Sequence, residues 1–187
     1  RVLAKKELPN GLSEIKLEFS PPSPTLEDRG EMGRFFTFAG RTTSYEGEPI
    51  QPRDNAVYLG IEDSMPKGVV LETMEYSVFP GFDPVVQRAG WDLESVTSEE
   101  EGELAEYAQQ GWFPSIPFIA NRVEPNEEIG IPPLQRFVLV GGQYHHLKQE
   151  ERIVRKIQTT TYFLPENSPI TDETPPELTI DPPVMDA

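Results

Sequence analysis

Strict alternation of apolar and charged side chains near the start of the chain is the feature that most constrains its fold. In residues 11–20, Ile15, Leu17 and Phe19 alternate with acidic and basic residues. Successive side chains of a strand point to opposite faces, so the pattern predicts a strand with one buried face. Prolines at positions 21, 22 and 24 end this strand, because proline has no N–H to donate to a neighbour.

Further strand patterns predict a mainly β, antiparallel body. They cover residues 34–38, 42–45, 56–61, 69–79, 135–144 and 152–164. The polar segment 62–68 is predicted to be a turn, and 135–144 is predicted to pair with 152–164. Leu147, Val154 and Ile157 also fit a short helix, so that alternative stays open here. The strand spacing favours a sandwich or a barrel-like body over alternating βαβ units.

One short helix is predicted over about residues 99–110. Ser98 and Glu101 have the spacing of a capping box, and the glutamates that follow Ser98 suit the positive end of a helix dipole. The apolar stripe at helical spacing consists of Leu104, Tyr107 and Ala108.

Two proline-rich segments divide the rest of the chain. Residues 112–133 are predicted to be a long irregular excursion, which is uncommon unless it functions or packs against a neighbour. Residues 165–187 contain six prolines, six acidic residues and no basic residue, which predicts an extended tail without a core of its own. The sequence therefore predicts a single β-rich domain over residues 1–164 and a tail over residues 165–187.

Charge excludes several classes of partner. The 187 residues include 32 acidic and 16 basic side chains, a net charge of −16. The charge is −9 over residues 92–128 and −6 over 165–187, but +3 over 129–164. A nucleic-acid partner is not expected, because phosphate contacts need clustered Lys and Arg. A membrane partner is not expected either, because no apolar stretch approaches 18 residues.

Residues that carry chemistry are scarce. There is no cysteine, which excludes disulfides, thiolate metal sites and cysteine nucleophiles. The two histidines, His145 and His146, are adjacent, so on a strand they would point to opposite faces and could not share one site. Paired carboxylates for glycoside hydrolysis stay open, because only their separation in space would decide. We predict no enzyme activity, no catalytic residue, no metal site and no cofactor.

Aromatic and tail residues supply the candidate interaction sites. Trp91 and Trp112 each follow a glycine and flank the predicted helix, with Phe113 next to the second. Exposed rings of this kind stack on sugars or anchor a partner protein, although packing of the helix on the sheet is the simpler role. In the tail, Leu178 and Ile180 belong to the only segment suited to add a strand to a neighbouring sheet.

A short segment resembles a known family. Residues 55–68, with the sequence NAVYLGIEDSMPKG, resemble a strand and acidic turn in β-rich domains of baseplate assembly proteins from contractile phage tails and related injection systems. The resemblance implies a non-enzymatic assembly role and brings no catalytic residues with it.

These features predict a structural or assembly protein. It would be a virion component, of a phage capsid or tail, or part of an injection machine, with copies of itself or neighbouring subunits as partners. The sequence does not determine a location, although it favours a virion or extracellular assembly over a membrane. The alternative is a carbohydrate-binding β-sandwich that uses exposed aromatics on a glycan partner.

Overall fold

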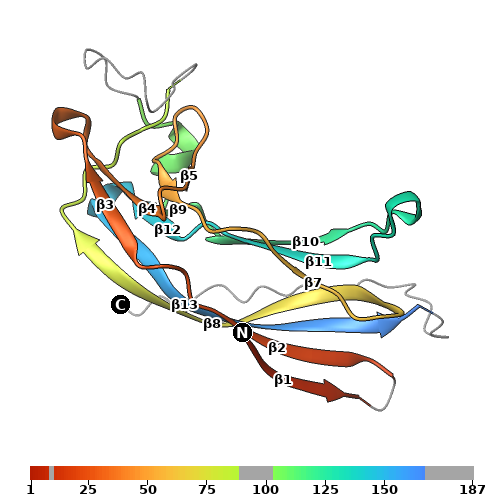
Figure 1. Ribbon diagram of the computed structural model, residues 1–187. Helices are drawn as coiled ribbons and strands as arrows, with labels where there is room; N and C mark the ends of the chain where they lie inside the picture. Colours follow the sequence, from red (N-terminus) through yellow and green to blue (C-terminus); the bar gives the residue numbers. More distant parts are fainter. Residues whose placement is uncertain (9–10, 89–102, 167–187) are drawn as a thin grey trace.

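Antiparallel β-strands make up most of the computed structural model, which describes residues 1–8, 11–88 and 103–166 (Figure 1). The prediction of a mainly β fold is confirmed. The strands in chain order are β1 (Val2–Glu7), β2 (Ser13–Phe19), β3 (Pro24–Asp28), β4 (Arg34–Phe38), β5 (Thr42–Thr43), β6 (Gln51–Pro52), β7 (Val57–Leu59), β8 (Ser64–Pro80), β9 (Trp112–Phe113), β10 (Phe118–Val123), β11 (Leu134–Leu139), β12 (Gly142–His145) and β13 (Glu150–Pro165). The described 3-10 helices are η1 (Gly30–Met32), η2 (Glu106–Gln109), η3 (Glu127–Ile129) and η4 (His146–Lys148). None of the described helices has the length and hydropathy needed to span a membrane.

The longest strands, β8 and β13, pair with each other along their full length and organise the large sheet (Figure 1). Their register runs from Glu150 opposite Pro80 to Pro165 opposite Ser64. Along its other edge β13 pairs first with β12 and then with β2, and these two strands in turn pair with β9 and β1. Every other strand of the large sheet is therefore joined to β13 directly or through one neighbour.

A second layer of shorter strands covers one face of the large sheet. It contains the small sheet, in the order β10-β11-β7, and the pairs β3-β4 and β5-β6. Apolar side chains fill the space between the layers in two main clusters. One consists of Ile15, Leu17, Phe137 and Phe163. The other consists of Phe36, Phe38, Phe82, Leu139, Tyr144, Ile153, Val154 and Ile157. The arrangement is layered, and the barrel alternative is wrong because the sheets do not close on themselves.

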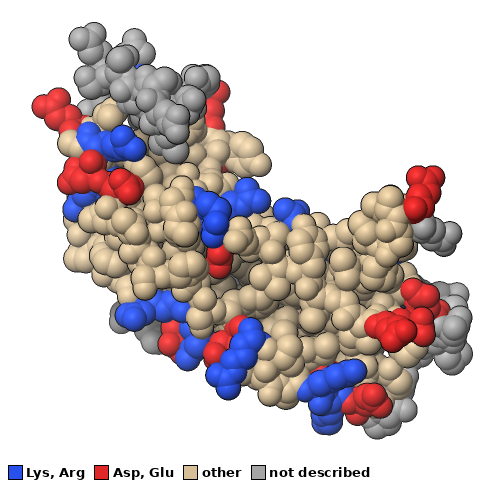
Figure 2. All heavy atoms as spheres, in the orientation of Figure 1, with Lys and Arg blue, Asp and Glu red and all other residues tan. Residues whose placement is uncertain are grey.

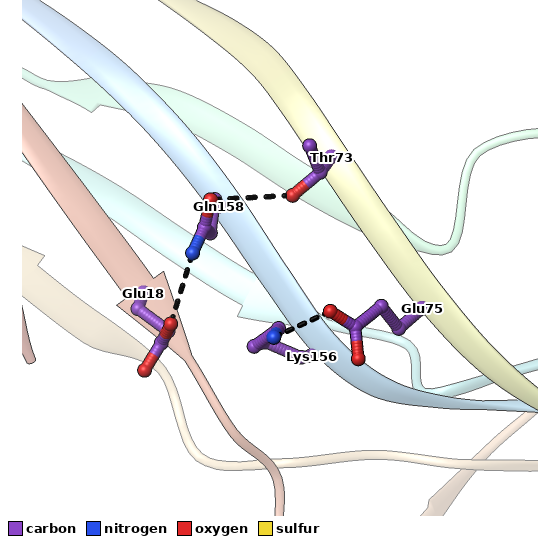
Figure 3. Close-up of polar contacts among 5 residues, drawn as sticks. All are labelled: Glu18, Thr73, Glu75, Lys156 and Gln158. Carbon is purple, nitrogen blue, oxygen red and sulfur yellow. Dashed lines mark hydrogen bonds and ion pairs between the residues drawn. The ribbon is translucent and has the colours of Figure 1, made fainter.

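The opposite face of the large sheet carries polar pairs that run across three strands (Figure 3). The amide of Gln158 on β13 donates to Glu18 on β2 at 3.0 Å and accepts from Thr73 on β8 at 3.4 Å. Lys156 on β13 forms an ion pair with Glu75 on β8. Because a one-residue slip would move each of these groups to the buried face, the two faces together fix the register.

Most predicted strands are confirmed with altered ends. The segments 11–20 and 34–38 contain β2 and β4, and the segment 152–164 lies within the longer β13. The predicted turn over 62–68 is wrong in part, because β8 already begins at Ser64. The predicted strand over 135–144 is two strands, β11 and β12, of which only β12 pairs with β13. Of the open alternative of a helix with Leu147, Val154 and Ile157, only Leu147 is helical, in the short η4, because the other two lie on β13.

Two other predictions need correction. Residues 112–133 are not irregular throughout, because β9 and β10 find partners in β12 and β11, which a local pattern does not reveal. The helix over 99–110 is replaced in its described part by the single turn η2. Ala105 has an extended backbone, and its N–H donates to the carbonyl of Gly47 at 2.8 Å. This contact to a distant loop holds Ala105 in an extended conformation, so no regular helix runs through it.

The end of β13 lies at the predicted domain boundary. β13 ends at Pro165, and residues 167–187 lie outside the described residues. The division into a domain over 1–164 and a tail over 165–187 therefore stays a prediction.

Gly141 separates β11 from β12 and allows the two strands to belong to different sheets. Its N–H donates to Pro52 and its carbonyl accepts from Val154, both at 2.7 Å. A methyl group added at Gly141 would overlap the ring of Phe38, which is fully buried. Glycine is therefore the only residue that fits at position 141, where the chain crosses the core.

We predict that Gly141→Ala lowers the free energy of unfolding by about 2–3 kcal/mol, because the added methyl overpacks the core. Chemical denaturation followed by tryptophan fluorescence measures the change. Gly68→Ala is the matched control, because no atom lies within 4 Å of its added methyl, and it should change stability by less than about 1 kcal/mol. Equal effects of the two substitutions would contradict this view of Gly141.

We also predict that Thr161→Val raises the free energy of unfolding by about 1 kcal/mol. Thr161 is fully buried, and its hydroxyl has no hydrogen-bond partner among the described residues. Thr160→Val is the control, because the Thr160 hydroxyl donates to Glu72 at 2.7 Å and its loss should lower stability. A lower stability of Thr161→Val in urea unfolding would show that the buried hydroxyl is satisfied.

Candidate protein-binding surface

A groove opens where β5, β9, β10 and β11 come together (Figure 1), within the concave upper side of the molecule (Figure 2). Its volume is about 370 Å³. Three distant segments line the groove. They contribute Thr43, Tyr45, Glu48, Pro49, Gln51 and Arg53; Phe113, Pro114, Ile116 and Ile119; and Arg136, Val138 and Val140.

The pleat of β11 decides which of its side chains face the groove. Arg136 and Val138 point into it, whereas Phe137 between them packs in the core against Phe19 and Phe118. On the neighbouring strand β10, Ile119 lies opposite Val138 and reaches the same side. The small sheet therefore supplies one face to the core and the other to the groove.

The rim of the groove carries large apolar side chains in contact with water. Tyr45 is 76% exposed, Ile116 57% and Ile119 52%. Single exposed apolar residues are ordinary, but several around one concavity are typical of surfaces that another molecule covers.

The cations of the groove have no counter-ion in the described part of the chain. The side chains of Arg53 and Arg136 form no hydrogen bond or ion pair with a described residue, and the Nε of Arg136 is buried. Glu48, which also lines the groove, is occupied: it accepts from the Tyr107 hydroxyl at 3.2 Å and from the Tyr45 N–H at 2.9 Å. These hydrogen bonds leave the charge of Glu48 in place, so two arginines and one glutamate give the groove lining a net charge of +1 in a protein of net charge −16.

Strand β10 leaves one backbone edge open beside the groove. It pairs only with β11 among the described strands, so every second N–H and C=O of Phe118–Val123 points away from the sheet. Four consecutive residues of this strand are exposed. Open edges of this kind accept a strand from another chain.

The predicted interaction residues fall in different places. Phe113 lines the groove and packs against Tyr107, with ring centroids 5.8 Å apart. Trp112 points elsewhere: its ring centroid lies 3.9 Å from the Arg152 guanidinium carbon and 5.2 Å from the His145 ring. The pKa of His145 is lowered, first because burial disfavours its charged form and second because the positive charge of Lys148 lies nearby. Trp91, Leu178 and Ile180 lie outside the described residues, so the binding role of all five stays a prediction.

Sequence inspection missed the other groove residues. Arg53, Arg136, Ile116 and Ile119 come from segments that are far apart in the chain. The one available signal was the alternation within 135–140, which separates core residues from groove residues. This alternation could not show which residues from other segments lie opposite the groove face of β11.

A buried carboxyl lies directly behind the groove. Gln51, which lines the groove, donates its side-chain amide to Glu151 on β13 at 3.4 Å. Glu151 is 2% exposed, and no described cation forms an ion pair with it. Burial raises the pKa of Glu151 well above its ordinary value, and the Gln51 hydrogen bond only partly offsets this. Gly142 makes room for both side chains, since a methyl there would overlap them.

Comparison with solved structures identifies the fold. One match is a complex of the pro- and mature domains of RgpB from Porphyromonas gingivalis, with a TM-score of 0.60 and 14% identity over 86% of this chain and 83% of that chain. Another is a structure on the zymogenic latency of gingipain K from the same organism, with a TM-score of 0.53 and 14% identity over 86% and 97% of the two chains. This chain has the fold of gingipain pro-domains. No family model and no curated protein sequence matches it.

These comparisons overturn the expected assembly role. The similarity of residues 55–68 to phage-tail and injection-system baseplate proteins is wrong as an indication of family, because the fold as a whole matches pro-domains. The virion hypothesis and the carbohydrate-binding alternative both lose their support, as do self-association and phage subunits as the expected partners. A short strand and turn recur in many β proteins, which explains the misleading resemblance.

We predict that Glu151→Gln stabilises the protein at pH 7–8 and has little effect near pH 4. Near pH 4 the carboxyl is mostly protonated in both states, since its unfolded pKa is about 4.3. Stability of the natural protein should fall as pH rises from there through the raised folded pKa, and the amide removes that loss.

Thermal unfolding of both proteins between pH 4 and pH 8 measures the difference. Glu150→Gln is the control, because it makes the same substitution at the neighbouring residue, which is only half-buried. A constant difference between the natural protein and Glu151→Gln at every pH would contradict the proton linkage.

Proposed function

We propose that this chain acts as a pro-domain: a non-catalytic partner that binds a protease domain and keeps it latent. The observation that carries the proposal is the shared fold, which extends over 86% of the chain in both pro-domain matches. One of those matches is a complex between a pro-domain and its mature domain, and the other concerns latency. The proposal transfers this role to the present chain.

The surface of the chain suits a protein partner. The groove combines exposed apolar side chains with two arginines that form no ion pair with any described carboxylate, and both kinds of side chain are common in protein interfaces. The open edge of β10 adds backbone groups that a partner can satisfy. Neither feature requires a reaction at the site, which agrees with a binding role.

The test is to titrate the purified chain into proteases and to measure hydrolysis of a fluorogenic peptide. The enzymes are protease fractions from the source organism of this chain, together with the mature domains of RgpB and gingipain K. We expect at least one activity to be lost with an apparent Kd of about 1 μM or tighter, an affinity of about −8 kcal/mol. The inhibited protease should also co-elute with the chain in size-exclusion chromatography.

Two controls separate latency from simpler effects. Polyglutamate at equal charge tests whether the net charge of −16 alone inhibits. Gel electrophoresis after the assay tests whether the chain stays intact, since a competing substrate would be cleaved. The proposal fails if none of these activities falls, or if polyglutamate inhibits equally well.

A further inference from the structure

The groove contains two guanidinium groups that form no ion pair with a described carboxylate. Arg53 and Arg136 stand among Ile116, Ile119 and Val138, and no described carboxylate pairs with either arginine. A cation in partly apolar surroundings loses hydration, and the loss is offset only when an anion or a hydrogen-bond acceptor meets it. A carboxylate binds a guanidinium through two parallel hydrogen bonds, which makes it the best-matched group.

The apolar residues of the groove indicate what else its occupant must carry. Tyr45, Ile116 and Ile119 present apolar surface to water, and Phe113 lies deeper. An occupant that covers them must carry apolar side chains beside its carboxylate. Glu48 accepts hydrogen bonds from Tyr107 and Tyr45 and forms no ion pair with either arginine, so the lining keeps a net charge of +1 from two arginines and one glutamate.

Resting on the proposed function, we propose that the groove is the docking site for a surface segment of the partner protease that carries an Asp or Glu beside exposed apolar side chains. The carboxylate pairs with Arg53 and Arg136, and the apolar side chains cover Ile116 and Ile119.

The charge distribution of the chain makes this site selective. The chain as a whole has a net charge of −16, which repels an acidic segment, whereas the lining of the groove has two arginines and one glutamate and attracts one. Figure 2 agrees with this: the charged atoms visible along the upper edge of the concave side are blue, and red atoms gather at its two ends. Repulsion elsewhere combined with attraction at one place sets the orientation of the complex.

The experiment measures inhibition of the protease that the natural chain inhibits most strongly, among the enzymes named above. One test variant is the double substitution of Arg53→Glu and Arg136→Glu. The other is the single substitution Ile116→Asp, which leaves the core intact because Ile116 is exposed. The matched control is Lys5→Glu with Lys6→Glu on β1, which makes the same charge change at two exposed residues outside the groove. Circular dichroism and thermal unfolding check the fold of each variant.

We expect the apparent Kd to rise at least about tenfold for both groove variants, and less than about threefold for the control. The Kd of the natural chain should also rise between about 50 mM and 500 mM salt, whereas that of the arginine variant should change little. Loss of folding alone would not remove the salt dependence selectively, and Ile116→Asp tests the groove without altering either arginine.

The outcomes separate the two proposals. If the natural chain inhibits and all variants inhibit equally, the docking site is wrong and the proposed function stands. If the natural chain inhibits nothing, both are wrong. If light scattering shows that the natural chain dimerises and that the arginine variant does not, the groove binds a second copy, and the proposed occupant is wrong.

Discussion

The pairing of β8 with β13 is the interaction on which the rest of the structure depends. These two strands run the length of the molecule, and β2 and β12 attach to the free edge of β13. The apolar residues of β13, such as Ile153, Ile157 and Phe163, form the floor of the core. The short strands of the second layer find their positions only on that floor, because strand pairs of two to six residues are not stable alone.

The groove follows from this layering. The small sheet turns one face to the large sheet and leaves the other to solvent, while Gly141 lets the chain pass from β11 into the large sheet beside β6. Segments from three parts of the chain thereby surround one concavity. A rigid core holds the groove residues, so a partner meets a preformed surface and loses little ordering entropy on binding.

The sequence predicts correctly those features that neighbouring residues determine, and it fails where residues far apart in the chain determine the structure. Alternation at Ile15, Leu17 and Phe19 is local and was sufficient for β2, and the strand pattern over residues 152–164 was sufficient for most of β13. The break between β11 and β12 depends on Phe38, about a hundred positions away, and the loss of the helix depends on Gly47. In the groove only Phe113 was anticipated, because Arg53 and Arg136 gain their meaning from what folding places beside them. A short resemblance was misleading for the same reason, since a strand and turn do not determine a fold.

The position of β13 in the chain has a consequence for biosynthesis. The central strand of the large sheet is Glu150–Pro165, so β2, near the start of the chain, acquires its inner neighbour only after more than 140 residues have been made. During translation the emerging chain can form only local hairpins such as β1-β2 and β3-β4, with apolar faces open to water. Formation of the core therefore waits for β13, and contacts this distant in sequence make that step slow. A binding partner or chaperone that shields the early hairpins would act in this interval.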